Sequence, residues 1–486
     1  MKAVFTVKLN FKIINSIDAV PLRTAFFQKR CDFMSVIAGI STPNAPGGIA
    51  VIRISGDSAL EIADKVFKAP NGIKAVDMKG YTCSYGHVFD DGQLIDECIL
   101  TVFKAPHSST GEDVAEISCH GGLFVTKKIL RIILENGAEP SGAGEFTKRA
   151  FLNGKLDLTQ ADAVMDIISA KGDTELKMAE SLRKGTVFNK ITSVRELLVK
   201  ILGDLSAWAD YPEEDIPEVE PDVLLSELME IKVQVESLIK GYDYGRILKN
   251  GINTVIVGRP NVGKSTLFNC LSGFERSIVT DIAGTTRDVI EESVKIGELV
   301  LRLSDTAGIR ETSDVIEEIG VDIAFRKLDE ADLIIAVFDG SCPLCEDDFK
   351  ILEKLQNKRC IAVINKSDRE IISDEQIINK YIQNTVMISA KNNDGIENLQ
   401  SAIENIFEAY EIDFDNGIVS NERQKKCVDT ALFHINEAIS ALESGVMLDA
   451  VTVLIDEALQ SLLELTGEKA SETVVNEVFS RFCVGK

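Results

Sequence analysis

Short apolar runs separated by polar turns dominate residues 34–150. Such runs predict β-strands, and they fall at Gly48–Ser55, His87–Phe89, Glu97–Phe103 and Val114–Cys119. An amphipathic stretch near Leu123–Asn136 predicts one helix. Strands of this kind with a single following helix are typical of a small α+β domain.

The hydrophobic pattern becomes helical from Thr159 to Asp210, a stretch without proline. Three prolines then interrupt an acidic segment, Pro212–Asp222, and a further helix is predicted to run to about Tyr242. From Asn421 onward the pattern is helical again, because apolar residues recur at three- and four-residue steps. These residues are Leu448, Val451, Ile455, Leu459 and Leu462.

Residues 252–407 lie between the two helical stretches and show a different pattern. Buried-strand runs occur at Asn253–Val257, Leu299–Leu303, Leu333–Phe338, Cys360–Ile364 and Val386–Ser389. Helical segments separate these runs, which is typical of a parallel α/β sheet. The economical interpretation is one helical domain into which an α/β domain is inserted; two separate small helical domains remain the alternative.

The predicted fold class is therefore a multidomain α/β and α protein. Its parts, in order, are an N-terminal extension (1–33) outside the fold, an α+β domain (34–152), a first helical part (153–250), an inserted P-loop domain with a parallel-rich sheet (251–408) and a second helical part (409–486).

The first 33 residues differ in charge from the rest of the chain. They hold six basic and two acidic side chains, a net charge of +4. Because the whole chain has a formal charge of −25, the remaining residues carry −29. Three interpretations stay open: an upstream start without structural role, a targeting segment, or a real arm. Their Arg and Ser content is low for a transit peptide, and the fold is expected to begin near Met34.

The overall composition excludes several classes of protein. Apolar residues make up 45% of the 486 residues, so the chain is not a disordered or fibrous one. No apolar run approaches the ~18 residues of a membrane span, and ten scattered cysteines suit reduced thiols in a cytoplasmic protein. The strong negative charge opposes nucleic-acid binding by the bulk of the chain.

The segment Gly258–Ser265 reads Gly-Arg-Pro-Asn-Val-Gly-Lys-Ser and matches the phosphate-binding P-loop, GxxxxGK[ST]. It follows a predicted strand and opens a predicted helix, which is the context that the motif requires. Its glycines let backbone N–H groups face a β-phosphate at a helix N-terminus. Lys264 is expected to contact the β- and γ-phosphates, and the Ser265 hydroxyl to bind Mg²⁺.

Three further motifs follow the P-loop in order. Asp305-Thr306-Ala307-Gly308 places a carboxylate where it can hold Mg²⁺ through water and an N–H where it can reach the γ-phosphate. Asn365-Lys366-Ser367-Asp368 ends a predicted strand, and the Asp368 carboxylate can accept hydrogen bonds from guanine N1 and N2. Adenine lacks this donor pair. Ser389-Ala390-Lys391 supplies a backbone N–H for guanine O6. Together these motifs predict binding of GTP rather than ATP.

The region between the P-loop helix and the next strand is expected to act as a first switch, in which Thr286 binds Mg²⁺ and the γ-phosphate. Residue 309, where many small GTPases have a water-orienting glutamine, is isoleucine. The hydrolytic residue must therefore come from elsewhere. The acidic run Glu311–Glu318 follows, and a solvated helix face is its alternative interpretation.

Motifs inside and outside the P-loop domain together resemble the MnmE (TrmE) family of tRNA-modification GTPases. The resemblance covers essentially all of 34–486. It depends on Gly47–Gly56, Thr110–Asp113, His120–Gly122, Gly144–Phe146, Arg149–Leu158, Gly284–Asp288 and the last four residues, Cys483-Val484-Gly485-Lys486. The motifs outside the P-loop domain separate this family from ribosome-assembly GTPases. Residues 1–33 depart from the family pattern.

The resemblance implies a folate-binding, dimerising N-terminal domain and a helical domain carrying the GTPase domain. It implies a homodimer that joins the FAD-dependent protein MnmG in a heterotetramer and acts on tRNA. This complex adds an aminomethyl or carboxymethylaminomethyl group to C5 of the wobble uridine. The one-carbon unit comes from a 5-formyl- or methylene-tetrahydrofolate, and GTP hydrolysis rearranges the complex.

The resemblance also implies the site residues. The folate ligands match Arg53, Glu116, Lys155 and Lys486, and the residues implied in catalysis are Glu317, which would orient water, and Cys483. A potassium ion would be held by Asn261, Thr280, Ile282 and Thr285. The nucleotide site comprises Asn261, Val262, Gly263, Lys264, Ser265, Thr266, Thr280, Asp281, Ile282, Ala283, Gly284, Thr285, Thr286, Asp305, Thr306, Ala307, Gly308, Asn365, Lys366, Asp368, Ser389, Ala390 and Lys391.

Alternative interpretations remain for single residues and for the whole chain. Arg53 could form a surface ion pair, His120 is expected to be a turn residue, and Cys483 could be an apolar residue at a helix end. The lone pair of cysteines in Cys342-Pro343-Leu344-Cys345 is interpreted as a loop, since zinc needs four ligands. The alternative function is a GTP-gated RNA- or ribosome-assembly factor without modification chemistry.

Overall fold

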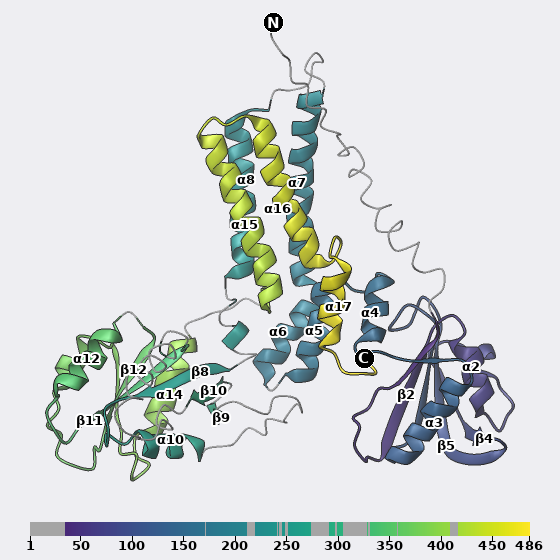
Figure 1. The fold of residues 1–486 in the computed structure, drawn as a ribbon, viewed down its shortest axis with the longest axis horizontal. Coiled ribbons are helices and arrows are strands. Elements are labelled where there is room, and N and C mark those ends of the chain that lie inside the picture. Colours follow the sequence, from purple (N-terminus) through teal and green to yellow (C-terminus); the bar gives the residue numbers. More distant parts are fainter. Residues whose placement is uncertain are drawn as a thin grey trace, which may run out of the picture. The chain divides into compact units, whose positions relative to one another are not determined.

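The computed structural model describes residues 35–170, 172–210, 219–240, 242, 245–247, 251–273, 291–296, 299–304, 328, 331–356, 358–408 and 417–486. The chain divides into two compact units. One unit comprises residues up to 165 with 182–233 and 426–486, and the other comprises 166–181 and 234–425. Figure 1 shows their helices and strands. The N-terminal extension lies outside the described residues.

The first unit contains a seven-stranded sheet with the strand order β3-β4-β5-β6-β2-β1-β7. Its strands pair antiparallel except for β1 with β7. The strands are β1 (Ile37–Ile40), β2 (Ile49–Ser55), β3 (Phe67–Lys68), β4 (Thr82–Asp90), β5 (Gln93–Phe103), β6 (Val114–His120) and β7 (Glu139–Pro140).

The predicted strands of this sheet are confirmed, and two of them are longer than the hydrophobic pattern indicated. The prediction His87–Phe89 covers only the end of β4, and β5 starts at Gln93 rather than at Glu97. The reason is a tight hairpin at Asp91-Gly92, where both residues have positive φ. The hairpin pairs β4 with β5 along their whole length, so polar residues enter the ladder.

Two helices, α2 (Ala59–Val66) and α3 (Leu123–Glu135), pack against one face of this sheet (Figure 1). Alternate residues of β2 and β6, such as Ile52, Ile54 and Ile117, are fully buried in the core between them. Because side chains alternate between the faces of a strand, Arg53 and Glu116 point to the opposite face. The helical packing therefore decides which face of the sheet presents the predicted folate residues.

The helical part of the chain comes from segments on both sides of the α/β domain. Its helices are α4 (Glu145–Leu152), α5 (Leu158–Ser169), α6 (Asp173–Arg183), α7 (Thr186–Asp210), α8 (Pro221–Ile239), α15 (Glu422–Glu443), α16 (Leu448–Thr466) and α17 (Glu472–Ser480). Helix α7 packs along α16, although the α/β domain separates them in sequence. This packing supports one helical domain with an insertion over two separate helical domains.

The second unit contains a six-stranded sheet with the order β13-β12-β11-β8-β10-β9. All neighbours pair parallel except β9 with β10. Its strands are β8 (Ile252–Val257), β9 (Glu291–Ile296), β10 (Leu299–Ser304), β11 (Leu333–Asp339), β12 (Cys360–Asn365) and β13 (Asn384–Met387). The antiparallel strand β9 was not predicted, and β13 ends before Ser389, which instead bridges to Asp394 in a turn.

Helices cover both faces of this second sheet. Ile335 and Val337 of β11 share a core with α10 (Lys264–Ser272) and α14 (Ile396–Glu408). The alternate residues Ile334 and Phe338 share the other core with α12 (Glu346–Lys354) and α13 (Glu375–Asn379). A mostly parallel sheet buried on both faces has its loops for ligands at the carboxyl ends of its strands.

Candidate functional site

The P-loop lies between the end of β8 at Val257 and the start of α10 at Lys264, as the motif predicted. Gly258 and Gly263 have φ angles of 152° and 102°. A Cβ on Gly258 would lie 2.4 Å from the Val337 oxygen, and one on Gly263 would lie 2.2 Å from Asn365 Nδ2. Both positions therefore require glycine, and the loop can turn its N–H groups toward a phosphate at the N-terminus of α10.

Lys264 places its ammonium group within the P-loop. Its Nζ donates hydrogen bonds to the carbonyl oxygens of Gly258, at 2.6 Å, and of Arg259, at 2.8 Å. Ser265 and Thr266 follow it in the first turn of α10 and are exposed. The positive charge and the hydroxyl groups thus stand together at the helix start, which is the donor set that phosphate and Mg²⁺ require.

The Asn365 side chain joins the P-loop to the loop after β13. Its Nδ2 donates to the Val262 carbonyl oxygen at 2.8 Å, and its Oδ1 accepts from the Ala390 N–H at 3.0 Å. Asn365 is 3% exposed. A buried amide that uses both of its ends holds two loops in fixed register, since either loop would leave an unpaired polar group if it moved.

Lys366 makes a second connection to the P-loop. Its Nζ donates to the Asn261 carbonyl oxygen at 3.0 Å and to Asp339 Oδ2 at 2.6 Å. Burial raises the pKa of the Asp339 carboxyl group, but hydrogen bonds from Lys366 and Ser341 outweigh it and lower this pKa to about 2. Asp339 is therefore ionised at neutral pH and holds the Lys366 ammonium in place.

Asp368 and Ser389 form the predicted guanine-recognising pair. Ser389 is buried, and its Oγ donates to Asp368 Oδ1 at 2.8 Å. This hydrogen bond is the main cause of the lowered pKa of Asp368, which is exposed. The carboxylate is therefore charged and oriented, with Oδ1 engaged by Ser389. Lys391 lies two residues beyond Ser389 and is also exposed.

These elements meet because β8, β12 and β13 run parallel in one sheet. Their carboxyl ends lie at the same edge, so the P-loop, Asn365 and Ser389 come together although more than 120 residues separate the first from the last. The remaining predicted nucleotide residues, Thr280–Thr286, Asp305–Gly308 and Glu317, lie outside the described residues.

The second candidate site lies on the seven-stranded sheet of the other unit. Arg53 on β2 stands opposite Glu116 on β6 in the ladder. Both Nε and Nη2 of Arg53 lie 2.8 Å from Glu116 Oε1. The Arg53 guanidinium also lies 5.4 Å from the centre of the Phe146 ring. Arg53 thus forms the ion pair that the sequence left open, and its guanidinium lies over an aromatic ring.

Lys486 reaches the same place through Phe146. The Phe146 N–H donates to the Lys486 carbonyl oxygen at 3.1 Å. The ring of Phe146 thus contacts Arg53 of the Arg53–Glu116 pair, while its backbone binds the backbone of Lys486. The sequence interpretation missed Phe146 as a site residue. The sequence feature that could have indicated Phe146 is its place in the Gly144–Phe146 motif.

Lys155, the fourth predicted folate residue, has a different partner. Its Nζ donates to the Pro106 carbonyl oxygen at 3.0 Å. The contacts found among the described residues do not link it to the other three. Cys483 is exposed and follows α17 rather than lying inside it, as expected for a reachable thiol.

Two other predictions for single residues can be compared with the structure. His120 is the last residue of β6 and not a turn residue, because its N–H and its Nδ1 both bind Asp96 and hold it in the strand, at 2.8 and 2.6 Å. This hydrogen bond to Asp96 raises the pKa of His120. Cys342 and Cys345 lie in the loop between β11 and α12, as interpreted.

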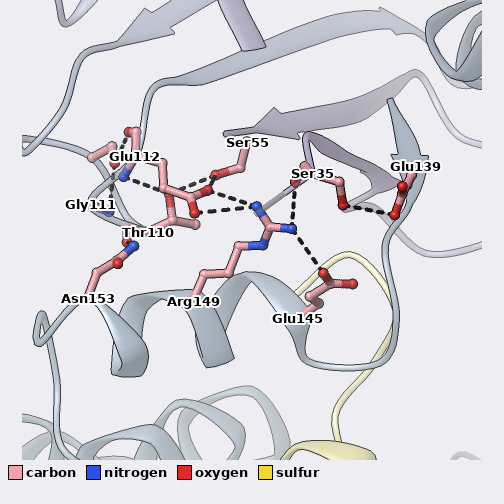
Figure 2. A network of polar contacts seen from close by, with 10 residues as sticks. Ser35, Ser55, Thr110, Gly111, Glu112, Glu139, Glu145, Arg149 and Asn153 are labelled. Atoms are coloured by element: carbon pink, nitrogen blue, oxygen red, sulfur yellow. Dashed lines mark hydrogen bonds and ion pairs between the residues drawn. The ribbon is translucent and has the colours of Figure 1, made fainter. Parts of the chain in front are cut away.

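A buried arginine holds α4 against the sheet. Figure 2 shows Arg149, which is 3% exposed, between two carboxylates. Its Nη1 lies 3.2 Å from Glu112 Oε2, and its Nη2 lies 3.1 Å from Glu145 Oε1 and 2.8 Å from the Ser35 oxygen. Ser55 Oγ donates to Glu112 Oε2 at 2.7 Å. The network fixes the helix that carries Phe146.

Replacing Arg149 with methionine should lower the free energy of unfolding by about 3–5 kcal/mol, because Glu112 and Glu145 lose their buried cation. Urea unfolding measures this change. Arg481→Ala is the control: its ion pair with Glu477 is exposed and joins the last turn of α17 to the residue that caps it, so its loss should cost no more than about 0.5 kcal/mol. Equal stabilities of the two variants would contradict the structural role of Arg149.

The chain matches known protein families along most of its length. The family described as MnmE helical domain matches residues 158–483, and the family described as GTP-binding protein TrmE N-terminus matches residues 36–155. Three curated relatives are each called tRNA modification GTPase MnmE. That of Acetivibrio thermocellus is 42% identical over 458 residues, that of Clostridioides difficile 42% over 453, and that of Carboxydothermus hydrogenoformans 41% over 456.

Each of these alignments covers 93% of this chain and 99% of the relative. They therefore span the sheet domain, the helices and the P-loop domain together, whereas a P-loop alone would match only one part. The three relatives are 41–42% identical to this chain over almost its whole length, and the two family matches follow one another along it. The chain therefore belongs to the MnmE family.

Proposed function

We propose that this protein binds and hydrolyses GTP as an enzyme of tRNA modification. The observation that carries the proposal is the buried Asn365 amide, which connects Val262 of the P-loop to Ala390 of the loop after β13. It sets the phosphate-binding and base-binding loops at one sheet edge. The relatives' shared description as tRNA modification GTPases supports the same function.

Asp368 and the loop 389–391 select guanine. The oriented Asp368 carboxylate accepts from the N1 and N2 donors of the base, and the loop 389–391 offers a backbone N–H to O6. A base without the donor pair leaves the carboxylate unpaired, which costs binding energy. Lys264 and the N–H groups at the start of α10 hold the phosphates.

The cation ligands are proposed from the motifs and the family resemblance, and of these ligands Ser265 and Asn261 lie among the described residues. Ser265 is exposed at the start of α10 beside Lys264, and its hydroxyl, with Thr286 and the Asp305 carboxylate, would hold Mg²⁺, an ion that prefers such oxygen ligands. Asn261, with Thr280, Ile282 and Thr285, would hold K⁺. Mg²⁺ neutralises charge on the phosphates when bound, and Glu317 would orient the attacking water.

The modification chemistry is the finer part of the proposal. Together with the FAD-dependent partner MnmG, the protein would add an aminomethyl or carboxymethylaminomethyl group to C5 of the wobble uridine. A tetrahydrofolate derivative would supply the one-carbon unit. Family membership supports this assignment, and Cys483, whose exposed thiol lies three residues before Lys486, would take part in the same chemistry.

The geometry around Phe146 fits a folate. Both guanidinium contacts fall on one oxygen of Glu116, Oε1, and a carboxylate can accept from the donor edge of a pterin. Arg53, Lys486 and Lys155 are cations that suit the anionic glutamate of folate. Arg53 and Glu116 have side chains that are 19% and 23% exposed, so a ligand can reach them.

The sheet face that carries Arg53 also supports a homodimer. Ile49, Tyr85 and Ile99 on this sheet are 70%, 52% and 47% exposed. Apolar side chains gathered on a face that α2 and α3 do not cover suit burial against a second copy. We propose a homodimer through this N-terminal domain, which in turn binds MnmG.

The charge of the chain bears on how tRNA is bound. A formal charge of −25 opposes the phosphate backbone, and we propose that much of the tRNA affinity belongs to MnmG.

Among the described residues, no helix has the length and apolar character to cross a membrane. We propose that the protein acts in the cytoplasm.

Mass analysis of tRNA from cells that lack this chain tests the function. Wobble uridines are expected to lose the C5 group, and wild-type protein should restore it, whereas Lys264→Ala should not, because its P-loop has lost the phosphate-binding charge. Unchanged wobble uridines in the deleted cells would overturn the proposal. Ribosome defects in place of the modification defect would favour an assembly factor.

A further inference from the structure

The last four residues, 483–486, which we call the tail segment, dock on the N-terminal domain through their backbone. The Gly144 N–H donates to the Cys483 oxygen at 3.3 Å, and the Phe146 N–H donates to the Lys486 oxygen at 3.1 Å. Ala143 and Val484 form an antiparallel bridge between these contacts. The tail segment is thus paired like a short strand with the chain that leads into α4.

Ser41 and the end of β1 hold the other side of the tail segment. Ser41, just after β1, donates from its Oγ to the Gly485 oxygen at 2.9 Å. Gly485 is buried with a φ of 91°, and a Cβ there would lie 2.0 Å from the Ile40 oxygen. The backbone of Gly485 therefore lies directly against the end of β1, where only glycine fits.

The docked tail leads to the Arg53–Glu116 pair. Phe146 is 2% exposed, and its backbone binds the last residue of the tail while its ring lies beneath the Arg53 guanidinium. The docked tail segment thus fixes the backbone of Lys486 beside Phe146, and Phe146 in turn contacts Arg53 of the pair. A lysine at the end of an undocked segment would be free to sample many positions, and ordering it on binding would cost entropy.

We propose that Ser41 and Gly485 are positioning residues for folate: they latch the tail segment so that Lys486 is preorganised beside Arg53 and Glu116. This inference rests on the proposed folate site and adds two residues to it that do not themselves touch the ligand. Preorganisation strengthens binding because the ordering of the lysine is completed before the ligand arrives.

Binding of 5-formyltetrahydrofolate to purified full-length variants tests this role. Ser41→Ala removes one hydrogen bond and should weaken binding about 3- to 10-fold, and Ser41→Thr, which keeps the hydroxyl, should restore it. Gly485→Ala should weaken binding at least about 10-fold, because the new methyl group meets the Ile40 oxygen. Val484→Ala is the matched control in the same segment, since Val484 is 61% exposed; its affinity should stay that of wild type.

Two further readouts separate positioning from general damage. With Lys486→Ala already present, Ser41→Ala should weaken binding no further, because the Lys486 side chain that Ser41 helps to position is then missing. Hydrogen exchange at the Gly144 and Phe146 amides should accelerate in Ser41→Ala and Gly485→Ala. GTP turnover should stay unchanged in Ser41→Ala and Gly485→Ala.

The outcomes distinguish the latch from the folate site itself. If wild-type protein binds the folate and Ser41→Ala and Gly485→Ala bind it equally well, the positioning role of Ser41 and Gly485 is overturned, while the folate site stands. Additive losses in the Ser41→Ala, Lys486→Ala double variant would also overturn it. If wild-type protein does not bind the folate at all, the proposed site fails instead, and the exchange data then report only how the tail docks.

Discussion

GTP hydrolysis by this protein is expected to be at least about tenfold faster in potassium chloride than in sodium chloride at equal ionic strength. Phosphoryl transfer needs positive charge near the β- and γ-phosphates, where an arginine finger contributes about 10³–10⁵ in rate in other GTPases. A monovalent cation held by Asn261 would supply that charge here. Steady-state turnover in the two salts measures the difference.

The contacts of Arg259, the arginine of the P-loop, favour a monovalent cation over this residue as the source of the positive charge. Arg259 lies in the P-loop, but its Nη2 is 2.7 Å from Cys342 Sγ and its Nε is 3.4 Å from Asp348 Oδ2. These contacts hold its guanidinium against the β11–α12 loop and the first turn of α12. Asn261 is exposed, and Lys366 binds its backbone oxygen and not its side chain, so its amide oxygen is available as an ion ligand.

Two substitutions separate the Asn261 side chain from its backbone. Asn261 has a φ of 64°, a conformation that asparagine and glycine adopt more readily than alanine. Asn261→Gly should therefore remove the amide without straining the loop, and it should abolish the potassium effect. Asn261→Ala should abolish it too, with added loss of nucleotide affinity from strain. Equal wild-type rates in both salts would remove the cation from the mechanism.

Asp368→Asn is expected to weaken GTP binding about 10²-fold or more and to favour xanthine nucleotides. The asparagine amide offers one acceptor and a donor, so it cannot accept from both N1 and N2 of guanine, whereas xanthine presents an oxygen at position 2 that the new donor can reach. Competition binding with guanosine and xanthosine nucleotides measures both changes.

Ser389→Ala is the control for this change of specificity. It removes the hydrogen bond from Ser389 Oγ to Asp368 Oδ1 at 2.8 Å but keeps the carboxylate. Affinity for GTP should fall only about 3- to 10-fold, with guanine still preferred over xanthine. Unchanged GTP affinity in Asp368→Asn would mean that another residue reads the base.

Local patterns in the sequence predicted the elements and the chemistry of the P-loop domain. Buried apolar runs marked β8, β10, β11 and β12, because the burial of each strand is visible in its own residues. The GxxxxGK[ST] pattern predicted strand, loop and helix, since its glycines and lysine act within eight consecutive residues. The local pattern failed at β9 and at the start of β4, where pairing with a neighbouring strand, and not apolar content, decides the structure.

Contacts between distant segments could not be predicted in the same way. A sequence pattern shows which residues are apolar or charged nearby, but it does not show which strand lies beside which. The ladder between β2 and β6 sets Arg53 opposite Glu116, and the parallel sheet brings Asn365 to Val262. Each contact closes a long loop of chain, so it exists only once the sheet has formed.

The sequence by itself determined the family, the order of the domains and the identity of the charged groups, because these depend on residue types at short spacing. The tertiary structure decided how those groups are held: Arg149 buried between two carboxylates, and the tail segment docked beside Phe146. The physical reason is burial, since a charge or a backbone amide removed from water must find its partner wherever the fold has placed it.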